Sequence, residues 1–431
     1  MHPNLSFEQA PPISVPFRFF LTAPLFGVAA GLLLFMQGGA MLGSRWMPGT
    51  LAGTHLLVAG FMLQAMCGAL LQFVPVAAGG NIWRPRLVAG VVHPLLVAAA
   101  LLLATAFLTE YTVLFLAASH CFALALGIYL LVVGIALWRT PASGATIVTL
   151  RIALAGLLVT LIFGVMLASG LARGDNLPFV MLTDIHAAWG LGGWALMLLA
   201  GVAYYVVPMF QLTPAYPAWL ARGVPWLLLV VLLLWTTQLF GFSDNARIAL
   251  LLSGLGVAGI FAAETLHLQS RRRRKVSDST LWFFRTAMIS LLAILLSVAL
   301  FVMLPTLSND PRSAVWLGML ILVGVFVSAI SGMLYKIVPF LIWLHLQRLG
   351  GLNTLPPTMN QMIAERTMRR QFFVHLGALA LLLAAVWLPV LARLAGLALA
   401  LDCALLGLNL IVAVRVYLGF KDRIHADAGD R

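Results

Sequence analysis

Long apolar runs, separated by short polar loops, make up almost the whole chain. Each run is close to the roughly 20 apolar residues that an α-helix needs to cross the hydrocarbon core of a bilayer. Backbone amides in hydrocarbon must bond within their own segment, so each run predicts a helix. The runs cover residues 17–36, 54–78, 86–108, 112–137, 149–171, 184–209, 224–242, 246–267, 282–304, 313–339, 372–391 and 395–418. This pattern predicts an all-α integral membrane protein of about twelve transmembrane helices.

Composition supports this fold class and argues against two other classes of protein. Of the 431 residues, 62% are hydrophobic and only 9% are charged, whereas soluble domains hold roughly 45–50% apolar and about 25% charged residues. A soluble fold could not hide so much apolar surface. The formal net charge of +13 does not indicate nucleic-acid binding, because the basic side chains lie in short loops beside the lipid headgroups. The lipid bilayer is therefore the expected partner.

Basic residues are divided unevenly between the two sets of loops. With the N-terminus inside, 15 Lys and Arg residues fall in cytoplasmic loops and 5 fall in the opposite loops. The first set is Arg84, Arg86, Arg139, Arg151, Arg222, residues 271–275, Arg285, Arg348, Arg366, Arg369 and Arg370; the second is Arg45, Arg173, Arg247, Arg312 and Arg393. The positive-inside rule then predicts a bacterial-type inner membrane protein with both termini in the cytoplasm. We expect a tail at 1–16, one polytopic domain at 17–418 and a second tail at 419–431.

Three similar segments indicate an internal repeat. They read GALLQFVPV at 68–76, GVAYYVVPM at 201–209 and GMLYKIVPF at 332–340. Their prolines, Pro75, Pro208 and Pro339, are separated by 133 and 131 residues, which is four helices each time. This spacing predicts a pseudo-threefold repeat of four-helix units, at roughly 17–137, 149–267 and 282–418. The third copy carries Lys336, for which we expect a snorkelling position at the membrane interface.

Three histidines occupy comparable depths in their spans. His55, His120 and His186 fall in the outer half of the predicted second, fourth and sixth spans. An imidazole inside a span indicates a functional site, and neutral imidazole ligates haem iron, copper or zinc. The alternative is that each ring makes a helix–helix hydrogen bond. His267, His345 and His375 are expected at the cytoplasmic interface instead. Asp184 and Asp402 are further polar candidates; Asp184 either orients His186 or faces outer water.

The arrangement resembles the heme-copper oxidase subunit I superfamily, of which cytochrome c oxidase subunit I is a member. In that family a second-helix histidine binds the low-spin haem, and a Val-Pro pair and a Gly-rich turn ending in Pro-Arg follow. The matching residues are His55, Val74, Pro75, Gly79, Gly80, Pro85 and Arg86, and Asp184, His186 and Trp189 resemble the run that opens the family's sixth helix. The resemblance implies haem ligation by His55, with His186 or His120 as the second ligand and Asp184 and Trp189 beside them.

Several family ligands are missing from this chain. Gly193 and Trp194 stand where the sixth helix would carry its copper histidine, and the spans at 224–242 and 313–339 contain no histidine. The resemblance therefore implies a relative without a binuclear oxygen-reducing centre, similar to NnrS-like proteins. We expect it to bind haem, or copper, for electron transfer with a quinol, or for nitric oxide or other gas sensing, without terminal oxidase activity. The alternatives are a transporter or metal- or haem-handling protein, and an accessory subunit of a respiratory complex.

Overall fold

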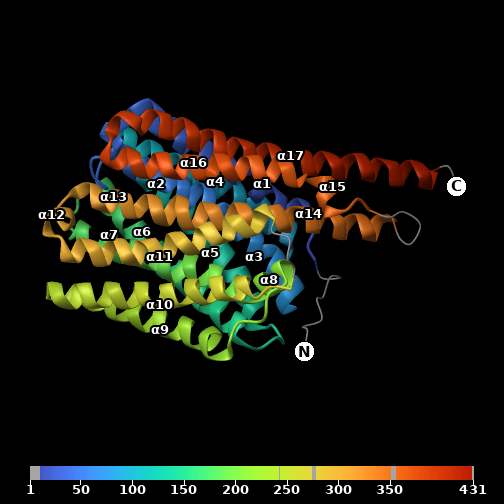
Figure 1. Cartoon of the computed structure of the whole chain (residues 1–431), viewed down its shortest axis with the longest axis horizontal. Helices are drawn as coiled ribbons and strands as arrows, with labels where there is room; N and C mark the ends of the chain where they lie inside the picture. Colours follow the sequence, from blue (N-terminus) through green and yellow to red (C-terminus); the bar gives the residue numbers. More distant parts are fainter. Residues whose placement is uncertain (1–9, 242, 274–277, 351–355, 430–431) are drawn as a thin grey trace.

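The computed structural model describes residues 10–241, 243–273, 278–350 and 356–429, and every regular element in these ranges is helical (Figure 1). Twelve of its continuous helical segments are long and apolar enough to cross a membrane. They run over Ser14–Leu42, Pro48–Ala78, Pro85–Thr109, Thr112–Trp138, Ala145–Arg173, Phe179–Gln211, Ala218–Phe240, Asp244–Ser270, Ser279–Met303, Pro311–Leu349, Glu365–Trp387 and Pro389–Ile424. The prediction of an all-α membrane protein with about twelve spans is confirmed.

The elements fall into three successive groups of four spans. The first unit contains α1 (Ser14–Gln37), η2 (Gly38–Leu42), α2 (Pro48–His55), η3 (Leu56–Met62), α3 (Leu63–Ala78), α4 (Pro85–Thr109) and α5 (Thr112–Trp138). The second contains α6 (Ala145–Arg173), α7 (Phe179–Ala188), η4 (Trp189–Leu196), α8 (Met197–Gln211), α9 (Ala218–Thr236), η5 (Thr237–Phe240) and α10 (Asp244–Ser270). The third contains α11 (Ser279–Met303), α12 (Pro305–Ser308), α13 (Pro311–Met319), η6 (Leu320–Val327), α14 (Ser328–Gly350), α15 (Met359–Met362), α16 (Glu365–Trp387), η7 (Pro389–Leu391) and α17 (Ala392–Gly429).

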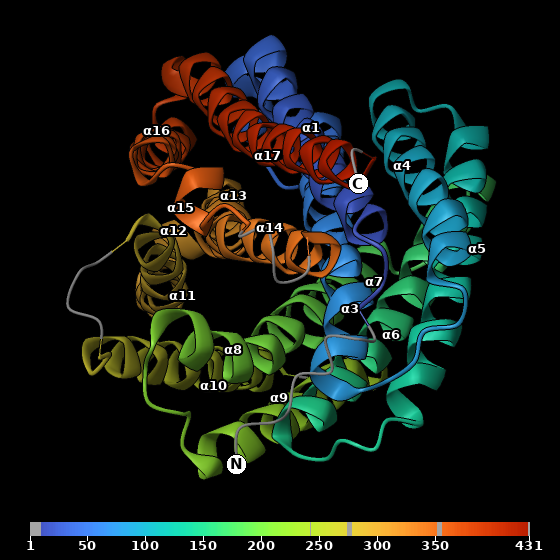
Figure 2. The same cartoon turned by 90° about the vertical axis from the view of Figure 1, so that its right-hand side faces the viewer.

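The three units pack in the same way. The first span of each unit contacts the last span of the unit before it: α6 packs on α5, α11 packs on α10, and α1 packs on α17. The third span of each unit contacts the fourth, in the pairs α4 and α5, α9 and α10, and α16 and α17. Because the first and last spans of the chain also meet, the units close into a ring (Figure 2).

The second span of each unit lies at the centre of the bundle. In these three spans 83%, 61% and 72% of the most apolar stretch is buried, against 28–50% in the other nine. Each central span also contains one π-helical segment: η3, η4 or η6. The segments begin at Leu56, Trp189 and Leu320, in each case 19 residues before the repeated proline. The π segments therefore follow the repeat seen in the sequence.

Glycines at repeated positions let each central span approach the first span of its unit. A Cβ atom on Gly60 would lie 2.3 Å from the Phe26 ring, and one on Gly324 would lie 2.7 Å from the Ser290 hydroxyl. In the second unit, Gly193 meets Gly156, whose own Cβ atom would lie 2.3 Å from the Gly193 carbonyl. Small residues at such crossings allow close helix packing in membranes. The positions are again separated by 133 and 131 residues.

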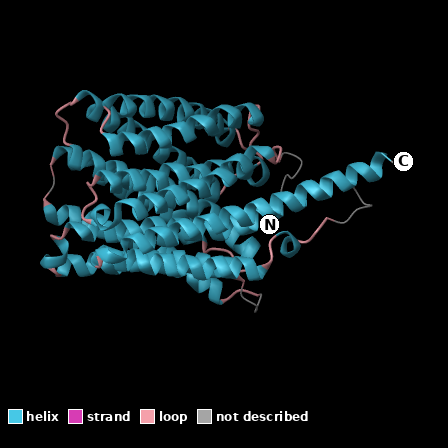
Figure 3. Cartoon of the chain, turned by 90° about the horizontal axis from the view of Figure 1, so that it is seen from above, coloured by secondary structure: helices cyan, strands magenta, loops and turns pink. Residues whose placement is uncertain are grey.

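Several predicted spans are shorter than the corresponding helices in the structure. The last span does not end at 418, because α17 continues through Gly429 and extends beyond the other helices (Figure 3). We call the end of the bundle where α1 begins and α17 ends the terminal face, and the other end the distal face. The connection between the predicted spans 313–339 and 372–391 is also shorter, since α14 reaches Gly350 and α16 begins at Glu365. Most of the N-terminal tail, and Arg274 and Lys275 of the basic cluster, lie outside the described residues.

Lys336 has a different environment from the one predicted. Its ammonium lies 2.7 Å from a carboxylate oxygen of Asp278, and both side chains are largely buried. Asp278 precedes α11 and also accepts hydrogen bonds from the Thr280 hydroxyl and the Leu281 amide. Burial opposes ionisation of Asp278, but the charge of Lys336 and these hydrogen bonds outweigh it and hold the pKa of the carboxyl below its usual value. The lysine is thus part of an ion pair between α14 and the start of α11, rather than a free snorkelling cation.

Candidate histidine site at the distal face

His55 is the last residue of α2, directly before the π segment η3. Its Nδ1 lies 2.8 Å from the backbone carbonyl of Leu51, one helical turn earlier. A carbonyl can only accept, so Nδ1 carries the hydrogen and, in the neutral ring, Nε2 keeps its lone pair. The half-buried ring stacks on Phe107 of α4, with 5.1 Å between ring centroids. Both contacts fix the orientation of a potential metal-ligating nitrogen.

His186 is held in the same chemical form on α7. Its Nδ1 lies 3.1 Å from the backbone carbonyl of Thr160 on α6, so this nitrogen is again the donor and Nε2 is the free one. The ring passes beside Gly164, where a Cβ atom would lie only 3.0 Å from the His186 Cε1 atom. Glycine at this position therefore leaves room for the imidazole. α6 sets both the tautomer of His186 and the space in which its ring lies.

The two imidazoles come from the distal ends of neighbouring central spans. His55 belongs to the first unit and His186 to the second, three residues before the π segment η4. The ion pair between Arg45 and Asp184 shows that the segments just before the two histidines lie side by side. π segments are frequent at functional sites. The structure thus places two of the three candidate histidines on neighbouring segments at the same end of the bundle.

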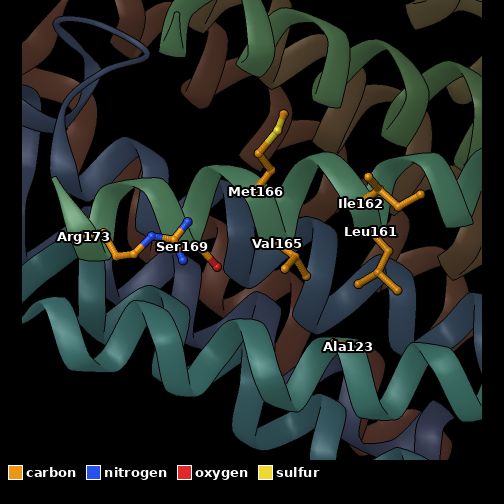
Figure 4. Close-up of a pocket in the computed structure, with 7 residues that line it drawn as sticks. All are labelled: Ala123, Leu161, Ile162, Val165, Met166, Ser169 and Arg173. Atoms are coloured by element: carbon orange, nitrogen blue, oxygen red, sulfur yellow. The ribbon is translucent and has the colours of Figure 1, made fainter. Parts of the chain in front are cut away.

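His120 is not part of this pair. Its side chain is exposed on α5, and its Nδ1 bonds to the Leu116 carbonyl of the same helix. One helical turn further on, Ala123 borders a shallow groove of 430 Å³ between α5 and α6 (Figure 4). The other lining residues are Leu161, Ile162, Val165, Met166, Ser169 and Arg173. This mainly apolar groove suits contact with lipid and contains neither His55 nor His186.

Asp184 and Trp189 have partners other than His186. Asp184 forms an ion pair with Arg45, with 2.7 Å between the guanidinium nitrogen and the carboxylate oxygen. Trp189 donates its indole hydrogen to Thr236 of α9 at 2.8 Å. The expectation that Asp184 orients the imidazole is therefore corrected, since the Thr160 carbonyl bonds to His186 instead. The ion pair links the chain just before α2 to α7, and so joins the first two units beside the histidine pair.

The donor set fits one kind of cofactor better than another. Among the described residues, no group of three or more His, Cys, Asp or Glu side chains could enclose a metal ion. Protein sites for zinc and copper usually need three or four such ligands. Haem brings four nitrogens of its own and asks the protein for at most two axial ligands. Two imidazoles with free Nε2 atoms match that requirement.

Several residues that shape this site were not predicted from the sequence. Phe107, Thr160 and Gly164 are apolar or small residues in unremarkable apolar runs, and only the fold places them against the imidazoles. His375, which was predicted at the cytoplasmic interface, is fully buried. The Nε2 atom of His375 lies 2.7 Å from the Ser328 hydroxyl and its Nδ1 lies 2.8 Å from an Asp402 oxygen. Ser328, His375 and Asp402 lie on three different spans, so no local sequence pattern could reveal their contact.

A scan against protein-family models found no match to this chain, and a search of curated proteins found no significant relative.

Proposed function

We propose that this protein binds haem near its distal face, where His55 and His186 are the residues that would hold it. The observation that carries this proposal is the pair of Nδ1–backbone hydrogen bonds, which leave both Nε2 lone pairs available on segments that the Arg45–Asp184 ion pair holds side by side. Metal-ligating histidines usually make this second hydrogen bond, because it fixes the tautomer and the ring direction. The resemblance to the heme-copper oxidase subunit I superfamily supports the same assignment.

We propose electron transfer or gas sensing rather than oxygen reduction, because the spans at 224–242 and 313–339 contain no histidine for a binuclear centre. Haem held by His55 and His186 would supply one-electron chemistry or binding of a small gas. The chain's own contribution is positional: Phe107 stacks on one imidazole, and Gly164 gives the other its space. We propose a quinol as the partner in electron transfer, or nitric oxide as the gas that is sensed. We further propose that the distal face is the periplasmic side of a bacterial-type inner membrane, following the distribution of basic residues.

An optical spectrum of the purified protein, made in cells supplied with haem, tests the proposal. We expect a Soret band and one haem per chain, with strong loss of haem in His55→Ala and in His186→Ala. His120→Ala is the matched control, because this imidazole has the same type of backbone hydrogen bond but is exposed on α5. Wild-type protein without haem, or equal loss in all three variants, would remove the proposal. Metal or haem uptake by proteoliposomes without bound haem would then favour the transporter alternative.

A further inference from the structure

A chain of three polar side chains is enclosed in the third unit. The hydroxyl of Ser328 on α14 lies 2.7 Å from Nε2 of His375 on α16, and Nδ1 of that ring lies 2.8 Å from Asp402 on α17. All three residues have 0% exposed surface. His375 lies ten residues after the start of α16, about 15 Å along the helix from the terminal face. Ionisable residues this deep in a membrane protein are costly to bury and usually mark a functional site.

The same residue types form the catalytic triad of serine hydrolases, but the site is closed to substrates. Ser328 is completely enclosed, so no substrate carbonyl can reach its hydroxyl in this structure. The arrangement can instead hold and move a proton. Imidazole is the side chain best suited to this at neutral pH, since its ordinary pKa lies near the physiological range.

The charge of the group changes with one proton. With His375 neutral, Nδ1 donates to the Asp402 carboxylate, Ser328 donates to Nε2, and the three residues carry one negative charge. Addition of one proton to Nε2 turns the ring into an imidazolium beside the carboxylate, and the net charge becomes zero. Burying an unbalanced charge is far more costly than burying a neutral ion pair. Proton uptake therefore removes the largest electrostatic penalty at this site.

Ser328 has a second hydrogen-bond acceptor that allows this change. Its hydroxyl oxygen also lies 3.2 Å from the backbone carbonyl of Val323, inside the π segment η6. When Nε2 becomes a donor, the serine hydrogen can turn to Val323 while its oxygen accepts from His375. The hydrogen bond between Ser328 and His375 is thus kept in both protonation states, and the serine donates to Val323 only when the ring is charged. The π segment supplies the acceptor, which gives this local helix distortion a physical role.

A stripe of polar side chains continues from these residues toward the terminal face. Ser328, Ser331 and Tyr335 share one face of α14, at spacings of three and four residues. The Tyr335 hydroxyl accepts from Asn409 of α17 at 2.6 Å, and Tyr335 lies within electrostatic range of Asp402. The next residue, Lys336, forms the ion pair with Asp278 at the edge of the bundle. The stripe therefore extends from the enclosed group towards a charged pair near the surface.

Two buried atoms near this route have no partner among the described residues. The Ser331 hydroxyl of the stripe and the Gln371 side-chain oxygen of α16 make no hydrogen bond there, although the Gln371 amide group donates to Asp402. Buried polar atoms are nearly always satisfied, by protein or by internal water. Two such atoms beside Tyr335 and Asp402 point to water molecules that complete the stripe.

We propose that Ser328, His375 and Asp402 form a proton-binding site, and that this stripe connects it to the terminal face. A proton from water at that face ends on Nε2 of His375, Asp402 stays a carboxylate, and release runs along the same route. The other titratable groups facing Asp402 are Tyr335 and Cys403. From α11, Phe283 contacts the imidazole, and from α1, Gly27 lies beside Cys403. The proposal does not depend on haem binding.

Nuclear magnetic resonance of histidine-¹⁵N-labelled protein in lipid tests the binding step, with His375→Gln used to assign the His375 signal. We expect this signal to change reversibly between the neutral and imidazolium forms as pH falls. In Asp402→Asn the ring should stay neutral, because its charge would have no partner. A wild-type ring that keeps one form from acidic to alkaline pH, whether neutral or charged, overturns the proposal. The wild-type titration decides the matter even if the variant does not fold.

The rate of the response to a pH jump tests the route. Tyr335→Phe removes one hydroxyl from the stripe and should slow protonation of His375 at least several-fold, as followed by time-resolved infrared spectroscopy. Tyr129→Phe is the matched control, because that tyrosine is equally buried but bonds to the Cys67 carbonyl in the first unit. Equal rates in the two variants would show that protons reach the site by another path.

Discussion

Several charged and titratable side chains of this bundle have partners that lie far away in the sequence. Lys336 pairs with Asp278, Asp184 pairs with Arg45, and His375 bonds to Asp402. In each case a polar group on one span is satisfied by a neighbouring span or the loop beside it. Such pairs lower the cost of polar residues in hydrocarbon and fix how neighbouring helices meet.

Replacement of Asp278 by asparagine should destabilise the protein at neutral pH. Removal of the carboxylate leaves the Lys336 ammonium without its charge partner. We expect the free energy of unfolding to fall by about 1–2 kcal/mol, a modest value because both side chains keep some exposure to solvent. The pKa of Asp278 is lowered from its usual 3.8, so its contribution is present above that value and is lost as pH falls below it. Thermal unfolding in detergent should separate wild type from the variant at neutral pH and bring them together in strong acid. A pH-independent difference would contradict this account.

Replacement of Gly164 by alanine should weaken haem binding without loss of the fold. The new methyl group would press on the His186 ring, where the Cβ position is 3.0 Å from Cε1, and move Nε2 away from its ligating direction. Gly127→Ala serves as the control, since a Cβ atom there meets nothing within 4 Å. Haem titration should show reduced affinity for the first variant alone. Unchanged affinity would mean that the position of the His186 ring does not matter.

At the scale of elements, repeated glycines and π segments set how each central span meets its unit. Gly156 and Gly193 bring α6 and η4 into backbone contact, and in the other two units Gly60 and Gly324 face side chains of the first span. In all three copies the repeated proline lies 19 residues after the first residue of the π segment. One packing solution is thus used three times, although the side chains around it differ.

Replacement of Gly156 by alanine tests the importance of that contact. A Cβ atom would lie 2.3 Å from the Gly193 carbonyl, so the two helices must separate. Overpacking of this kind typically costs about 1–3 kcal/mol. Thermal unfolding should reveal the loss, with Gly134→Ala as a control because its Cβ position is open. Similar midpoints for the two variants would show that the crossing tolerates a wider spacing.

The sequence predicted the spans, their number and the repeat, because apolar length and equal proline spacing are local or periodic signals. It also singled out His55, His120 and His186, because all three fall in the outer halves of their spans, and their role as ligands stays a prediction. The ring partners Phe107 and Gly164 could not be predicted, because nothing distinguishes them within their apolar runs. His375 was assigned to the interface because it lies near basic residues in sequence, whereas three-dimensional packing encloses it between α14 and α17. Hydropathy likewise carries no signal for a π segment.

For the whole molecule, three similar units close into a ring in which the last span packs on the first. This closure places the three central spans inside and leaves the outer spans in contact with lipid. His55 belongs to the first unit and His186 to the second, and the enclosed Ser328, His375 and Asp402 belong to the third. The two candidate sites are therefore separate, one at the distal face and one deep within the bundle.

Thiol labelling in intact cells tests the proposed orientation. Val390 lies at the distal face between the last two spans and is 87% exposed, whereas Trp219, at the start of α9, is exposed near the terminal face. We expect Val390→Cys to react with a membrane-impermeant maleimide added outside, and Trp219→Cys to react only after the membrane is opened. The reverse pattern would invert the topology and place the histidine pair on the cytoplasmic side.

Electron paramagnetic resonance of the oxidised, haem-loaded protein tests whether His55 and His186 hold the haem, because the signal depends on the ligands of the iron. We expect a low-spin ferric signal of the bis-imidazole type in the wild type. We expect conversion to a high-spin signal, or loss of haem, in His55→Ala and in His186→Ala, and no change in His120→Ala. A low-spin bis-imidazole signal that survives either of the first two substitutions would contradict the assignment of these histidines as the ligands.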